Sequence, residues 1–170
     1  MATHAVVNQA PPRVDLHEYA TNTALLEGVE RYDAGWAHHQ LHLTGQRVGA
    51  ASFHSDAAMA NRVEPVPQTH DRYGNRIDEV EYDESYHRII GAAIADGAHT
   101  SAWAEPRPGA NVARAATFML YAQIEPGHAC PVSMTHSAVP VIASHPPLAE
   151  EWMPRLLSRT YESELRPGKA

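Results

Sequence analysis

Cysteine is nearly absent from this sequence: Cys130 is the only one in 170 residues. A single thiol excludes an internal disulfide framework and a structural zinc site built from cysteines. Basic side chains are also scarce, since 13 Lys and Arg face 20 Asp and Glu, which gives a net charge of −7. Proteins that bind nucleic acid through phosphate contacts need a basic patch. None is visible here, so the composition does not favour a nucleic-acid-binding role.

Long apolar runs are missing as well. No window approaches the roughly 20 apolar residues of a membrane-spanning helix. The first 12 residues lack the basic and then apolar order of a signal peptide. We therefore expect a cytoplasmic protein without a membrane partner. Apolar residues still make up 44% of the chain, enough for one domain with a packed core.

Apolar residues recur at helical spacing along most of the chain, which predicts an all-α bundle of about six or seven helices over residues 22–160. Pro11 and Pro12 break any helix in residues 1–21, which we expect to form an extended arm. Residues 161–170 read as a connector. The first helix is predicted to start at Asn22 or Thr23, and Asp33 is predicted to cap the second.

The second half of the chain gives the clearer helix signals. Residues 68–82 are predicted to be a polar connector with a turn at 73–75, and no strand is expected. Asp83 is the predicted N-cap of the next helix, and Gly97 its stop. The strongest helix is expected over 111–125. Residues 132–144 are apolar nearly all round, interrupted by Pro140, which predicts a helix buried on every side. A short helix broken near Pro154 is expected in 147–160.

Two histidines are the first candidates for chemistry. His38 and His42 are four residues apart, so on a helix they share a face and could hold a metal between them. A catalytic zinc usually needs a third protein ligand and often an adjacent glutamate, as in H-E-x-x-H; here Gln40 and Leu41 occupy the places before His42, and no partner is evident. A polar helix face is therefore the favoured interpretation, and a small histidine-dependent metalloprotein stays open as an alternative.

No nucleophile, phosphate loop or metal set stands out elsewhere. Ser133 and Ser137 flank His136, but sequence adjacency is not a catalytic triad, and no G-x-S-x-G motif is present. Gly45 and Gly49 fall inside a predicted helix and do not form a glycine-rich phosphate loop. We therefore predict no catalytic, cofactor-binding or metal-binding residue in this chain. If the polypeptide takes part in catalysis, other residues supply the chemistry.

One long stretch carries a family resemblance: residues 112–142, VARAATFMLYAQIEPGHACPVSMTHSAVPVI. Shorter matches are Asn8-Gln9, Gly35-Trp36, Ala60-Asn61 and THDRYGNRID at 69–78. Together they resemble the N-terminal helical domain of the AidB-like branch of the acyl-CoA dehydrogenases, in order and over essentially the whole chain. The most specific part is ARAATFMLYAQ followed by Cys130-Pro131 and Met134-Thr135.

The resemblance implies a subunit of three parts, in which N-terminal and C-terminal helical domains enclose a middle β-domain. It implies FAD held between the middle and C-terminal domains of a tetramer, and a glutamate base in the C-terminal part. In this branch the C-terminal part is also associated with DNA binding in the response to alkylation damage. Because this sequence ends at Lys169-Ala170, we expect 161–170 to lead toward a missing middle domain. FAD and DNA contact are then expected only in the full-length parent.

One role can be transferred to residues of this chain. In acyl-CoA dehydrogenases the acyl chain of the acyl-CoA ligand runs between two N-terminal helices and the flavin, and those helices resemble 111–125 and 132–144. Met119, Gln123, Met134 and Thr135 are then candidates for the channel wall, with ordinary core packing as the alternative. The expected function is to shape the substrate channel and to pack against the other domains and subunits. A stand-alone helical interaction module without catalysis is the alternative.

Overall fold

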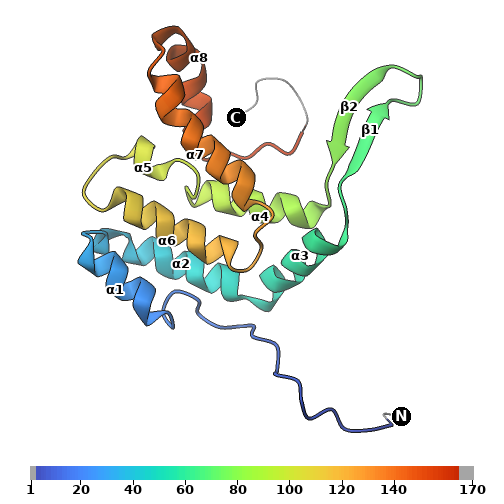
Figure 1. Ribbon diagram of the computed structural model, residues 1–170, viewed down its shortest axis with the longest axis vertical. Coiled ribbons are helices and arrows are strands. Elements are labelled where there is room, and N and C mark those ends of the chain that lie inside the picture. Colours follow the sequence, from blue (N-terminus) through green and yellow to red (C-terminus); the bar gives the residue numbers. More distant parts are fainter. Residues whose placement is uncertain (1–2, 165–170) are drawn as a thin grey trace.

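The computed structural model describes residues 3–164 and is mostly helical (Figure 1). Its elements are, in order, α1 (Thr23–Arg31), the 3₁₀ turn η1 (Gly35–Ala37), α2 (His38–Gly49), α3 (Ala51–Arg62), β1 (Val66–His70), β2 (Arg76–Glu81), α4 (Glu84–Ala95), α5 (Ser101–Ala104), α6 (Ala110–Ala122), α7 (Ala129–Ala143) and α8 (Pro146–Leu156). The all-α prediction is confirmed, apart from a small hairpin, and the helix beyond the predicted seven is the four-residue α5. Most of the predicted connector, 165–170, lies outside the described residues.

The core forms where α2, α4 and α6 pack together in the body of the molecule (Figure 1). Each helix contributes buried apolar side chains. Leu41 and Val48 come from α2, Ile89 from α4, and Leu120 from α6, and all four side chains are buried. The α7–α8 pair packs as a second unit at the edge of this body (Figure 1).

The end of the N-terminal arm packs closely against α2 at two glycines, Gly45 and Gly49. The Asp15 N–H donates to the Gly49 carbonyl at 2.7 Å, and the Glu18 N–H donates to the Gly45 carbonyl at 3.1 Å. A Cβ at position 49 would lie 1.7 Å from the Leu16 carbonyl oxygen, so a larger residue would push this segment away. Glycine at 45 and 49 therefore lets the backbone approach closely, and Tyr19 is fully buried as a result.

The helix boundaries follow local capping chemistry. The side chains of Asn22 and Asp83 accept hydrogen bonds from the N–H groups of Leu25 and Ser85, which confirms both predicted starts. Gly97 follows α4 with a φ of +78°, as its predicted role as a stop requires. The prediction for Asp33 is wrong: it has a φ of +59° in the turn after α1, and α2 begins only at His38.

The expectation of no strand is also wrong. β1 and β2 pair antiparallel, with Val66 opposite Glu81 and Gln68 opposite Glu79. The predicted turn is present, since Gly74 has a φ of +84° and the Asp71 carboxylate accepts from the Tyr73 and Asn75 N–H groups. Every residue of β2 is exposed. Because neither face of the hairpin is buried, its sequence carries no alternation of apolar and polar residues, and the strands could not be read from periodicity.

Helix α7 departs most from expectation. It starts at Ala129 and runs through Pro140 without ending. The prediction that it is buried on every side is wrong, because only Val132 and Val139 are buried, while Met134 and Val141 are each 68% exposed. Helix α8 likewise continues through Pro154 to Leu156. Within residues 3–164, no helix is both long enough and apolar enough to span a membrane.

Candidate functional site

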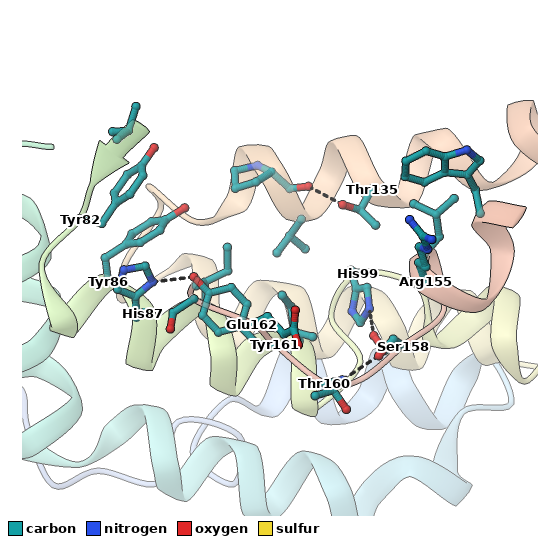
Figure 2. A pocket seen from close by; sticks show the side chains of 18 residues that line it. Tyr82, Tyr86, His87, His99, Thr135, Arg155, Ser158, Thr160, Tyr161 and Glu162 are labelled. Carbon is teal, nitrogen blue, oxygen red and sulfur yellow. Dashed lines mark hydrogen bonds between the residues drawn. The ribbon is translucent and has the colours of Figure 1, made fainter. Parts of the chain in front are cut away.

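A cavity of about 340 Å³ lies between α4, α7, α8 and the segment that follows α8 (Figure 2). We call it the inner cavity. Its lining mixes apolar side chains with a few polar and aromatic groups: Val80, Tyr82, Tyr86, His87, Ile90, Ile94, His99, Pro131, Val132, Thr135, Trp152, Arg155, Leu156, Ser158, Thr160, Tyr161, Glu162 and Ser163. A volume of this size is in the range of small-molecule sites.

One end of the inner cavity is aromatic. The rings of Tyr82 and Tyr86 stack with centroids 4.5 Å apart, and His87 Nδ1 lies 2.6 Å from the Tyr161 hydroxyl (Figure 2). Burial, together with the neighbouring tyrosines, raises the pKa of Tyr86 to about 12. Its phenol therefore stays neutral at physiological pH.

The other end holds the chain that follows α8 in place. His99 Nε2 lies 2.9 Å from the Ser158 carbonyl, and the Thr100 hydroxyl donates to the Leu156 carbonyl at 3.0 Å. Burial lowers the pKa of His99, so its imidazole is neutral and Nε2–H is the donor to Ser158. The guanidinium of Arg155 lies 5.2 Å from the centre of the Trp152 ring at the same end (Figure 2).

A second concave surface lies on the exposed side of α7. Its residues fall on one helical face, and we call them the outer face of α7: Cys130, Ser133, Met134, Ser137, Ala138, Val141 and Ile142. The helix contains no Asp, Glu, Lys or Arg over its 15 residues. The Ser137 hydroxyl donates to the Ser133 carbonyl, so it is satisfied within the helix. This face therefore presents mainly apolar atoms to its surroundings.

The four predicted channel residues are not brought together. Met134 lies on the outer face of α7, whereas Thr135 lines the inner cavity and donates to the Pro131 carbonyl at 3.0 Å. Met119 lies in a groove between α1 and α6, and Gln123 donates to the Glu18 carboxylate at 3.2 Å. The four residues thus lie on separate surfaces, and their role in a channel stays a prediction.

The two candidate metal ligands on α2, His38 and His42, contact other side chains. His38 Nδ1 lies 2.6 Å from the Tyr19 hydroxyl, and its Nε2 contacts the Glu30 carboxylate. His42 Nδ1 lies 3.2 Å from Nε2 of His17. Among residues 3–164, no three His, Cys, Asp or Glu side chains are grouped as a metal site requires. The metalloprotein alternative thus finds no third ligand in this part of the chain.

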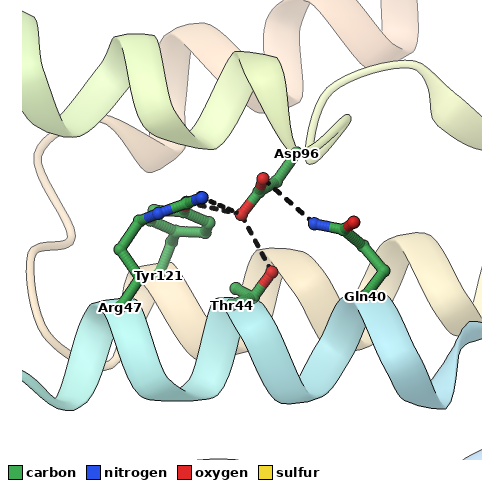
Figure 3. A network of polar contacts seen from close by, with 5 residues as sticks. All are labelled: Gln40, Thr44, Arg47, Asp96 and Tyr121. Carbon is green, nitrogen blue, oxygen red and sulfur yellow. Dashed lines mark hydrogen bonds and ion pairs between the residues drawn. The ribbon is translucent and has the colours of Figure 1, made fainter.

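A buried polar network around Asp96 was not anticipated from the sequence (Figure 3). Its Oδ2 accepts from the hydroxyls of Thr44 and Tyr121, both at 2.8 Å, and from the Arg47 guanidinium. Oδ1 accepts from the Gln40 amide at 3.1 Å. Burial, reinforced by the Asp96 charge, holds the pKa of Tyr121 far above its ordinary value. The network joins the C-terminal end of α4 to α2 and α6, and all the groups at its centre are engaged, which is typical of a structural role.

Comparison with known proteins identifies the family. Residues 8–163 match the family described as the N-terminal domain of the adaptive response protein AidB. The chain belongs to this family. AidB of Escherichia coli (strain K12), an acyl-CoA dehydrogenase by name, is 39% identical over 168 residues, which are 98% of this chain and 31% of that protein. The resemblance drawn from the sequence is therefore confirmed.

Two solved structures share the fold of this AidB N-terminal domain. The apo form of Bd2924 has a TM-score of 0.81 at 23% identity, covering 91% of this chain and 32% of that one. ACDH-11 of Caenorhabditis elegans, solved in complex with C11-CoA, has a TM-score of 0.72 at 19% identity, covering 94% and 29%. The chain thus spans about a third of the length of the relatives it matches.

Proposed function

We propose that this chain is the N-terminal domain of an FAD-dependent protein of the acyl-CoA dehydrogenase type, and that the outer face of α7 packs against the other domains and forms part of the acyl channel wall. The observation that carries this proposal is that outer face: an uncharged helix with Met134 and Val141 each 68% exposed. Such a contiguous apolar surface usually marks an interaction site. A relative of the same fold was solved with an acyl-CoA, which agrees with an acyl ligand for the parent.

The energetic argument follows from the exposed area. Fully burying an aliphatic or methionine side chain contributes about 1.5–3 kcal/mol. Covering the exposed two thirds of Met134 and Val141 would therefore contribute about 2–4 kcal/mol to association with a partner surface. Ser133, Ser137 and Ala138 keep the middle of this face small, so that a partner or ligand can approach the helix closely.

The outer face of α7 does not fit FAD by itself. The outer face of α7 carries no cationic side chain for the pyrophosphate, and the Ser137 hydroxyl is committed to its own helix. Under this proposal FAD, the catalytic base and any DNA-binding surface belong to the remaining two thirds of a cytoplasmic, tetrameric parent. This domain contributes shape and the exclusion of water from the channel, and it supplies no reacting group.

The test uses a full-length AidB-family protein that carries this sequence. Val141→Lys should place a charge in the proposed interface, and Val7→Lys is the matched control because Val7 is 91% exposed in the arm. We expect Val141→Lys to lower flavin content, measured by absorbance, and to lower acyl-CoA binding, while Val7→Lys keeps both. Circular dichroism of the isolated domain should be the same for both variants. If Val141→Lys retains full flavin content and acyl-CoA binding, the stand-alone interaction module becomes the better account.

A further inference from the structure

The inner cavity lies on the side of α7 that faces away from its outer face. Val132 and Thr135, three residues apart on the helix, point into the inner cavity, while Met134, Ser137 and Val141 share the other side. We infer that the inner cavity is a binding site for a small amphipathic carboxylate, with its apolar tail under α7 and its carboxylate on Arg155. This site is separate from the outer face of α7 and does not depend on the function proposed for that face.

Several lining residues of the inner cavity suit an apolar tail. Ile90 and Ile94 come from α4, Val132 from α7, and Leu156 from the end of α8. None of these four side chains offers a hydrogen bond, so a polar ligand group placed there would lose its contacts with water without compensation. The hydroxyl of Thr135 nearby already donates to its own helix. An alkyl or aryl segment is therefore the favoured occupant.

The Arg155 end suits an anion. Within residues 3–164 Arg155 makes no ion pair, and its guanidinium lies against the ring of Trp152. His99 at this end is neutral and engaged with Ser158, which leaves Arg155 as the cation. The fork of a guanidinium matches a carboxylate with two parallel hydrogen bonds.

The opposite end sets the orientation of the ligand. The stacked rings of Tyr82 and Tyr86 close it, and Figure 2 shows them far from Arg155 along the cavity. Arg155 is the only Lys or Arg among the described lining residues, so a ligand carboxylate is attracted to its end of the cavity. The tail therefore points toward the tyrosines.

The test compares octanoate with 1-octanol, which has the same chain length and no charge, by isothermal titration calorimetry on the 170-residue chain. We expect one octanoate per chain. Arg155→Gln should weaken octanoate binding at least about tenfold and leave 1-octanol unchanged, because only the acid uses the charge. Arg107→Gln is the matched control, since that guanidinium lies over Trp36, outside the inner cavity, and it should bind octanoate normally.

A second pair of variants locates the site independently of charge. Ile94→Phe should fill the inner cavity and weaken both ligands at least about fivefold, while Val141→Ser on the outer face of α7 should change neither. Circular dichroism should show the same helix content in all variants. The inference is overturned if octanoate does not bind, or if Arg155→Gln binds octanoate as tightly as the unsubstituted chain does. It is also overturned if Val141→Ser weakens binding and Ile94→Phe does not.

Discussion

The body formed by α2, α4 and α6 and the outer face of α7 are both rich in apolar residues, yet they end in opposite environments. In the body, Leu41, Ile89 and Leu120 are buried, and the buried hydroxyls of Thr44 and Tyr121 meet on Asp96. On α7, Met134 and Val141 stay largely exposed. The body is completed by this chain alone, whereas under our proposal the outer face of α7 is covered by other domains. The apolar composition of a helix therefore predicts that other atoms will cover it, but it does not predict whether those atoms belong to the same chain.

The largest expected effect comes from breaking the network in the body. Asp96→Ala removes the carboxylate that Arg47, Thr44 and Tyr121 share, and we expect the free energy of unfolding to fall by about 4 kcal/mol, because the buried hydroxyls of Thr44 and Tyr121 both lose their acceptor. Urea denaturation measures the change. Asp56→Ala breaks the exposed pair with Arg88 and should cost less than about 1 kcal/mol. Equal losses for the two variants would mean that the Asp96 network contributes little.

Truncating one apolar side chain in each region sharpens the comparison. Leu41→Ala should lower the free energy of unfolding by about 3 kcal/mol, since it leaves a cavity in a fully buried site. Met134→Ala on the outer face of α7 should change it by no more than about 0.5 kcal/mol in the isolated chain. Chemical denaturation of both variants gives the numbers. A large loss for Met134→Ala would show that its face is already covered within this chain.

The next largest effect on stability comes from the close contact between the N-terminal arm and α2. Gly49→Ala places a Cβ against the Leu16 carbonyl, and we expect a loss of about 2 kcal/mol through overpacking. Proteolysis in residues 13–21 should become faster, because the segment is displaced. Gly28→Ala in α1 is the matched control, since a Cβ there meets no atom within 4 Å. That variant should be as stable as the unsubstituted chain or slightly more stable; a similar loss in both variants would show that contact with the arm is not the cause.

The smallest effect concerns pH. Burial lowers the pKa of His99 in the folded chain. On acidification the unfolded chain therefore takes up a proton on this histidine at a higher pH than the folded chain does. The contribution of neutral His99 is complete above the unfolded pKa of about 6.5 and is lost as the pH falls toward the lowered folded value. Unfolding free energies measured from pH 7.5 to 5.5 should therefore fall with pH. His99→Gln should flatten this slope, whereas His4→Gln in the exposed arm should leave it unchanged.

Local signals in the sequence predicted much of the fold. The apolar stripes of α4 and α6 and the caps at Asn22 and Asp83 depend on residues within one or two helical turns of each other. The spacing of these residues was therefore sufficient to predict the helices. The hairpin was missed because exposure of both its faces removes the alternation that marks a strand. The burial of α7 was overestimated because apolar composition does not distinguish a core from an interface.

The candidate sites were harder to predict than the helices. Asp96 lies 49 residues from Arg47 and 25 from Tyr121, so no local pattern marks their network. The inner cavity joins Tyr82, Ile94 and Arg155 from separate elements, and each also reads as an ordinary helix or connector residue. By contrast, the family resemblance rests on consecutive residues of α6 and α7, and for that reason it could be drawn from the sequence.

The central claim, that the outer face of α7 is a contact surface, is tested most directly through Cys130. This thiol is the only one in the chain, is exposed, and belongs to that face. Its alkylation by N-ethylmaleimide should be followed by peptide mass spectrometry, in the isolated chain and in a full-length AidB-family protein that carries it. We predict that the rate falls at least about tenfold in the full-length protein, while circular dichroism shows the isolated chain folded. Equal rates in the two proteins would contradict the account.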